Sequence, residues 1–260
     1  GTTGTVPTDL HGMISTGPQG NRVYFGYGTN GGGIVQIVDR EKLLKGPAEP
    51  TPENLLYPQV GRLDMIPIVG AHTTYPMLGI EVPAFLHDKI GAKRDFVMIV
   101  NEQILNECQD ARQMIWFADI TAEAKPMVVS NYTAPELGGK FCERGGRFGS
   151  HSSNESFAPV FRNKLAAIAY FNAGVRMVDI RNPFQPREVA YFIPSITKNT
   201  DPRCLKIDGK DRCKVAIQTN NVETDDRGYI YIVDRANTGM HILELTGSAR
   251  KIANMKAAVQ

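Results

Sequence analysis

Three of the five histidines in this 260-residue chain have the same setting, since each opens a short strand-like segment that follows a turn. They are His11 in HGMIS, His72 in HTTYPML and His151 in HSSNESFAP. Three neutral imidazoles, completed by water or a carboxylate, commonly hold zinc, iron or copper in proteins. The spacing therefore raises the hypothesis of a metal site, provided that the fold brings the three segments together.

Two carboxylates and an arginine could complete such a site. Glu102 follows an apolar strand and could act as a ligand, orient one or serve as a general base, whereas a solvated turn residue is the alternative. Glu223 lies two residues past the position that corresponds to the histidines, so strand alternation could aim it the same way. Arg147 could contact an anionic substrate, or be an ordinary surface arginine. We predict Glu223 as a further metal ligand, and Glu102 and Arg147 as catalytic residues.

The elements that must position these residues form a repeat. A polar turn, a strand rich in β-branched and aromatic residues, a second turn and a strand that ends on an acid recur at 21–39, 94–119, 163–179 and 227–244. A short strand precedes each copy and an apolar run follows three of them, which gives four antiparallel strands about every 60 to 80 residues. Helical segments are expected only at 40–46 and after residue 249, where a final outer strand is the alternative.

We predict one all-β domain over residues 1–260, a β-propeller of four-stranded antiparallel blades at about 11–68, 72–133, 151–196 and 215–255. A β-sandwich is the weaker alternative, and a larger ring with further blades upstream stays open. In a propeller the strands that open the blades line a central channel, so the three histidines could meet there. Histidines that cap neighbouring backbone, or a pocket without metal, are the competing interpretations. His241, inside a strand, is expected to be structural, and His87 to be exposed.

Three segments carry a closer resemblance. GIVQIVD at 33–39, AGVRMVDIRNPFQPREVAYF at 173–192 and DDRGYIYIVDRANTGMHILEL at 225–245 resemble the LVIVD-repeat bacterial β-propeller family. The segment from 72 to about 133 departs from it, with WFADIT in place of a valine-rich strand. The resemblance implies the propeller fold and an exported setting; it implies no reaction, because the repeat is a structural signature.

The cysteines favour an oxidising compartment. Cys204 and Cys213 bracket the polar turn LKIDGKDR, a spacing that suits a disulfide across a hairpin, and Cys108 and Cys142 could form a second bridge. An even count of four without a CxxC pair is more typical of secreted or periplasmic proteins than of reduced ones.

Charge and hydropathy argue against a nucleic-acid-binding or membrane-spanning protein. The net charge is +2 without long runs of like charge, which disfavours a nucleic-acid partner. The longest apolar stretches, 96–100 and 165–171, are far shorter than the roughly 20 residues that span a bilayer. No GxSxG motif appears, so nucleophilic catalysis is disfavoured.

The sequence thus favours an exported propeller with a divalent transition metal (zinc, iron or copper) on its axis, acting on a small-molecule substrate as a hydrolase, lyase or oxidoreductase. The alternative is a non-catalytic extracellular or periplasmic propeller that binds a protein or glycan partner. Either form could assemble as a homo-oligomer.

Overall fold

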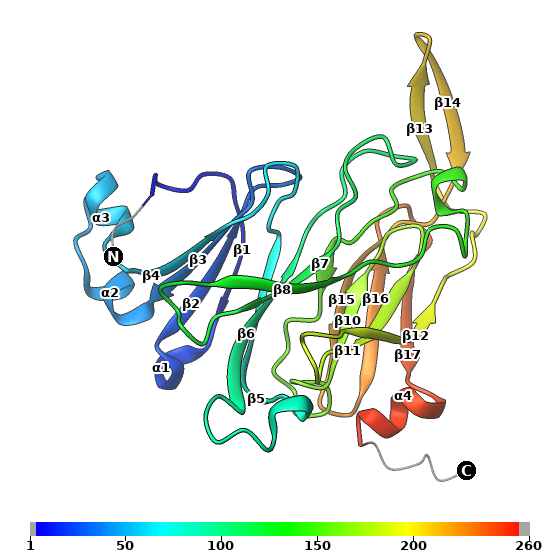
Figure 1. Ribbon diagram of the computed structural model, residues 1–260. Coiled ribbons are helices and arrows are strands. Elements are labelled where there is room, and N and C mark those ends of the chain that lie inside the picture. The colour runs from blue at the N-terminus through cyan, green and yellow to red at the C-terminus, as the bar shows by residue number, and fades with distance from the viewer. Residues whose placement is uncertain (1–3, 255–260) are drawn as a thin grey trace. The chain divides into compact units, whose positions relative to one another are not determined.

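The computed structural model describes residues 4–254 (Figure 1). The chain forms two compact units. Unit 1 comprises Gly1–Glu102 and Ile115–Asn131, and unit 2 comprises Gln103–Met114 and Tyr132–Gln260. The chain therefore passes from one unit to the other three times, at 102/103, 114/115 and 131/132.

Unit 1 is built around two antiparallel sheets, each with four strands in sequence order. The first sheet contains β1 (Leu10–Ser15), β2 (Arg22–Tyr27), β3 (Ile34–Asp39) and β4 (Gln59–Asp64). The second contains β5 (Thr73–Glu81), β6 (Lys93–Val100), β7 (Ile115–Asp119) and β8 (Met127–Tyr132). The short helices of this part are α1 (Gly17–Gly20), α2 (Arg40–Lys45), α3 (Pro52–Leu56) and the 3₁₀ turn η1 (Pro83–Phe85).

Unit 2 contains one sheet of four strands, one of three strands and a separate hairpin. The four-stranded sheet contains β9 (Ser152–Ser153), β10 (Leu165–Ala169), β11 (Val175–Asp179) and β12 (Arg187–Phe192). The three-stranded sheet contains β15 (Thr219–Thr224), β16 (Tyr229–Asp234) and β17 (Met240–Glu244). The hairpin is β13 (Pro202–Ile207) and β14 (Lys210–Val215), and the helical turns are η2 (Phe141–Glu143) and α4 (Gly247–Ile252).

The predicted fold class is confirmed: the chain is an all-β protein of antiparallel β-propeller blades. One correction concerns the fourth blade, which has three strands instead of four among the described residues. Its expected outer strand is absent there because the chain after β17 turns into α4. The single domain over 1–260 stays a prediction.

The sheets of each unit are held by an apolar cluster between them. In unit 1, Tyr24, Val35 and Ile37 of the first sheet lie in one cluster with Val97 and Ile99 of the second. Alternate residues of a strand point to one face, so each of these strands contributes every second side chain to the cluster. A similar cluster in unit 2 joins β10 and β11 to β15 and β16.

The acids that end the third strands have a structural task. Asp39 accepts a hydrogen bond from the backbone N–H of Lys42 at 2.9 Å and so caps α2. Asp119 accepts from the backbone N–H of Thr121 at 2.9 Å and from Arg94 at 2.6 Å. Asp179 likewise accepts from the backbone N–H of Arg181 at 3.2 Å and from the guanidinium of Arg181 at 2.7 Å. The repeated acid therefore fixes the turn that leads into the fourth strand.

The carboxylates of Asp119 and Asp179 should make the folded protein less stable at low pH. Burial opposes ionisation of Asp119 and Asp179, but hydrogen bonds from the following turn and an arginine outweigh it and hold both pKa values below the ordinary one. A carboxyl whose pKa is depressed by folding stabilises the protein above its unfolded pKa, and this contribution disappears as the pH falls through the folded pKa. Urea unfolding at pH 7 and pH 3 should therefore show a smaller change with pH for the Asp119→Asn, Asp179→Asn variant than for the native protein. Asp226→Asn, at an exposed turn, is the control; an unchanged pH dependence of the double variant would contradict the assignment.

Candidate metal centre

Unit 1 brings together three of the predicted site residues. One ligand atom from each of His11, His72 and Glu102 lies within 4.8 Å of the other two. The two imidazole rings have centroids 4.8 Å apart and are inclined by 44°. His11 is exposed, His72 half-buried and Glu102 buried, so the group spans the boundary between the interior and the solvent.

The two histidines meet because β1 and β5 approach closely. His72 directly precedes β5, and its backbone N–H donates to the carbonyl of Val100 at 2.9 Å. Gly12 follows His11 in β1, and a Cβ at this position would collide with the carbonyl oxygen of His72. The absence of a side chain at residue 12 thus allows the backbone that carries one imidazole to lie against the backbone that carries the other.

Glu102 is placed by its neighbour. Asn101, fully buried after the end of β6, donates through its side chain to the carbonyl of Gly70. Its side-chain oxygen accepts from the indole N–H of Trp116 at 2.7 Å. These two bonds fix the chain at the point where it leaves the sheet, so the carboxylate of Glu102 is held next to the 70–72 segment.

Hydroxyl groups orient both imidazoles. Thr29 donates its hydroxyl proton to Asp9 at 2.9 Å, and its oxygen lies 3.0 Å from Nε2 of His11. Since that proton is already used, the oxygen accepts from Nε2–H, so Nδ1 of His11 is the nitrogen that could bind an ion. Nδ1 of His72 lies 3.0 Å from the hydroxyl oxygen of Thr73, and this contact orients the ring. Such partners fix the tautomer of metal-binding histidines and raise their basicity.

The donor set fits a divalent transition metal. Two imidazoles and one carboxylate bind catalytic zinc in some hydrolases and iron(II) in oxygenases, with positions left for water or substrate. Ligand atoms on a tetrahedral ion with bonds of about 2.0–2.1 Å lie about 3.4 Å apart. An ion would therefore draw this group together, and the exposed ring of His11 has the room to turn.

His151, predicted as a further ligand, lies in unit 2 and has a different setting. It is 5% exposed, and its Nδ1 lies 2.5 Å from the carbonyl of Asn220. Its ring centroid is 5.3 Å from that of Phe171. The contact with Asn220 orients the imidazole against β15. Such a contact is expected of a histidine that caps neighbouring backbone. A metal-binding role for His151 stays a prediction.

Glu223, predicted as a metal ligand, uses its carboxylate on backbone groups of unit 2. It accepts from the N–H of Glu155 at 3.2 Å, of Ser156 at 3.1 Å and of Thr224 at 2.7 Å. Burial and then the neighbouring carboxylate of Glu223 raise the pKa of Glu155. These bonds indicate a role in ordering the loop after β9, and its role as a ligand stays a prediction.

Arg147, predicted to act in catalysis, is half-buried in unit 2. Its guanidinium donates to the carbonyl of Gln103 at 3.1 Å and lies 5.2 Å from the ring centre of Phe171. Its backbone N–H donates to Gln218 at 3.0 Å. These contacts indicate that Arg147 joins the 103–114 loop to the rest of unit 2. A catalytic role for Arg147 stays a prediction.

The other two histidines lie as expected. His241 is part of β17, with its ring edge against Phe192 at 5.5 Å between centroids. His87 is exposed after η1.

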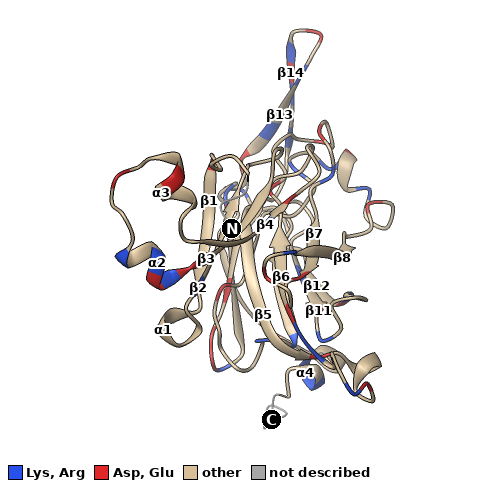
Figure 2. Cartoon of the chain, turned by 60° about the vertical axis from the view of Figure 1, so that its left-hand side comes forward, with Lys and Arg blue, Asp and Glu red and all other residues tan. Residues whose placement is uncertain are grey.

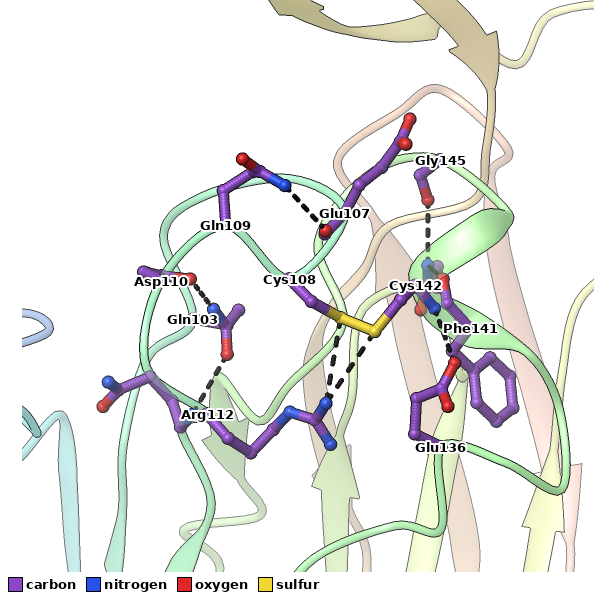
Figure 3. Close-up of a disulfide and its surroundings, with 12 residues drawn as sticks. Gln103, Glu107, Cys108, Gln109, Asp110, Arg112, Glu136, Phe141, Cys142 and Gly145 are labelled. Atoms are coloured by element: carbon purple, nitrogen blue, oxygen red, sulfur yellow. Dashed lines mark hydrogen bonds between the residues drawn. A yellow bond between two sulfur atoms is a disulfide. The ribbon is translucent and has the colours of Figure 1, made fainter.

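Both expected disulfides are present, and both lie in unit 2. Cys204 and Cys213 face each other across the β13–β14 hairpin, and Cys108 joins Cys142 (Figure 3). The guanidinium of Arg112 lies 3.8 Å from each sulfur of the second bridge. Disulfides of this kind are typical of proteins that fold in oxidising compartments.

The 103–114 loop anchors the β13–β14 hairpin, a contact that the sequence did not predict. The buried carboxylate of Glu107 pairs with Arg212 at 2.5 Å and with Lys214 at 3.2 Å. Figure 2 shows lysine and arginine along the hairpin, and Glu107 from the 103–114 loop pairs with two of these cations. No local sequence signal marks Glu107, because its partners are more than a hundred residues away.

Comparisons with known proteins give structural likeness alone. No family model matches the chain, and no curated protein matches it. A chain of "COPII on membranes, outer coat vertex" is 11% identical with a TM-score of 0.42, over 92% of this chain and 58% of that chain. A chain of "The structure of the COPII coat assembled on membranes" has the same identity and TM-score over 92% and 32%. The β-propeller domain of Cps50 (Swd1) from Myceliophteria thermophila is 11% identical with a TM-score of 0.28, over 93% and 85%.

This chain thus spans 58% and 32% of the first two chains. Among the described residues, no helix is both long and apolar enough to cross a membrane.

Proposed function

We propose that this chain is a metal-dependent enzyme whose centre is formed by His11, His72 and Glu102, with zinc or iron(II) as the ion. The single observation that carries the proposal is the convergence of these three ligand atoms within 4.8 Å, from three separate segments of the chain. A divalent ion in such a site supplies Lewis acidity and activates bound water or a substrate oxygen.

The chain's own residues would do the rest. Asp9 and Thr29 keep the proton of His11 on Nε2, and Thr73 orients the ring of His72. Glu102, buried beside them, offers a negative charge that offsets part of the charge of the ion. Because His11 is exposed, a small-molecule substrate can approach from the solvent side.

An exported setting and membership of the LVIVD-repeat family are part of the same proposal. The two disulfides and the repeated turn-capping acids Asp39, Asp119 and Asp179 support it. Mapping of both disulfides in protein isolated from its native source is the measurement that checks the compartment.

Calorimetric titration of the chelator-treated protein with zinc tests the site. We expect one ion per chain. Thr29→Val removes the hydroxyl that orients His11 and keeps the shape, so zinc should bind about 10- to 100-fold more weakly. Thr246→Val is the matched control, since Thr246 is exposed and makes no capping bond to α4. The proposal is wrong if the native protein binds neither zinc nor iron(II) in stoichiometric amount.

A further inference from the structure

A cavity of unit 2 lies between the turn that follows η2 and the two segments that flank the β13–β14 hairpin. Its volume is about 250 Å³, whereas pockets for drug-sized molecules have about 300–1,000 Å³, so it suits a smaller molecule. Arg144 and Asn172 are its polar lining residues, and none of the eight lining residues is acidic. The rest of the wall is apolar and consists of Ile193, Pro194, Ile196, Val215, Ala216 and Ile217.

Asn172 has an acceptor that the fold leaves unused. Its side-chain Nδ2 donates to the carbonyls of Phe141 and Gly145, at 2.8 Å each. These bonds use both protons of the carboxamide and fix its orientation, because a flipped amide would set Oδ1 against two carbonyl oxygens. Oδ1 is therefore buried without a partner among residues 4–254, in a side chain that is only 2% exposed. Such an acceptor costs free energy unless a donor reaches it.

Arg144 is the cation of this cavity. It is exposed, its guanidinium carbon lies 4.6 Å from the centre of the Phe141 ring, and it forms no ion pair within the described residues. Phe141 and Gly145, which bind the carboxamide of Asn172, come before and after it in the same turn (Figure 3). Gly145 has a φ of +88°, and a Cβ there would lie 2.6 Å from Cβ of Lys214, so the turn packs closely against β14. The unpaired cation and the unused acceptor thus belong to one closely packed part of unit 2.

We propose that this cavity binds a small 2-hydroxycarboxylate with a compact apolar side chain. The carboxylate pairs with Arg144, the hydroxyl donates to Oδ1 of Asn172, and the side chain lies against the apolar wall. The two polar groups of the ligand are adjacent because the two protein groups are attached to one turn. A hydroxyl suits the site better than an ammonium group, since no lining residue is acidic and Arg144 would repel a second cation. None of the lining residues belongs to the candidate metal centre.

Calorimetric titration of the full chain with 2-hydroxy-4-methylpentanoate tests the site. A chelator in the buffer keeps metal ions from binding the hydroxy acid, so the result is independent of the candidate metal centre. We expect one molecule per chain. The same acid without its hydroxyl, 4-methylpentanoate, should bind about tenfold more weakly because Oδ1 of Asn172 stays without a donor. Leucine, with an ammonium group in place of the hydroxyl, should also bind about tenfold more weakly.

Two variants test the place of binding. Arg144→Gln removes the cation and should weaken binding of the hydroxy acid about tenfold or more. Arg162→Gln is its matched control, since Arg162 is also exposed and lies 5.0 Å from the centre of the Phe157 ring. Ile196→Asp puts a carboxylate on the apolar wall and should weaken binding to a similar extent, whereas Ile207→Asp on the β13–β14 hairpin should not. The four replaced side chains are exposed, so circular dichroism should match that of the native protein.

The measurements can overturn the proposal at two levels. No binding of 2-hydroxy-4-methylpentanoate to the native chain, or equal binding by Arg144→Gln and Ile196→Asp, would show that the cavity is not its site. Binding of 4-methylpentanoate or leucine as tightly as the hydroxy acid would overturn the role of Asn172 and, with it, the 2-hydroxycarboxylate as the class of ligand.

Discussion

The His72→Ala protein is expected to bind zinc more than about a hundredfold more weakly than the native protein, because loss of a ligand costs more than the 10- to 100-fold typical of an outer partner. His72 is one of only two imidazoles in the candidate centre. Without it, His11 and Glu102 remain as a two-ligand site, which holds a divalent ion poorly in competition with water. Calorimetric titration of both proteins with zinc at neutral pH measures the difference.

The control for the zinc affinity is a histidine outside the candidate centre. His87→Ala removes an exposed imidazole after η1 and should leave the zinc affinity unchanged. The His72 side chain is half-buried, so circular dichroism of the His72→Ala protein should match that of the native protein. Equal zinc affinity of His72→Ala and native protein would show that bound zinc lies at another place.

Replacement of Cys108 and Cys142 by alanine is expected to lower the free energy of unfolding by about 4 kcal/mol, because this bridge closes a loop with a sequence separation of 34 residues. In the chain-entropy account, a cross-link restricts the unfolded chain more when the loop is longer. The bridge between Cys204 and Cys213, with a separation of 9, should contribute about 3 kcal/mol on the same account.

Urea unfolding of the two double variants under identical conditions gives both values. The hairpin variant is the control, since it also removes one disulfide of unit 2 and differs mainly in loop length. A larger loss in the Cys204→Ala, Cys213→Ala protein would contradict the ranking and would assign the main stabilising role to the hairpin itself.

Local patterns were enough to predict most of the fold. Alternating apolar residues and turns gave the strands, and the acids that end them occupy turn-capping positions because their short side chains reach the following N–H groups. The equivalent settings of His11 and His72 also predicted their convergence, since both precede or open the first strand of neighbouring sheets.

Features that depend on contacts between distant turns could not be predicted. Thr29 reaches His11 only because two loops meet, and nothing in its own neighbourhood marks it. The sequence around Glu102 fits a solvated turn residue as well as a ligand, whereas in the structure the side chain is buried after Asn101. The sequence after β17 is compatible with a helix and with a strand because the segment is short, and the structure forms the helix α4 there.

The three passages of the chain between the units have a consequence for biosynthesis. The 103–114 loop belongs to unit 2 yet emerges before β7 and β8, which complete a sheet of unit 1. Neither unit is a continuous stretch of sequence, so no single cut separates them. During synthesis, Cys108 can form its disulfide only after Cys142 has been made. Glu107 can form its ion pairs only after Arg212 and Lys214 have been made. Folding in the order of synthesis therefore leaves an acidic, thiol-bearing loop open until most of the chain has been made.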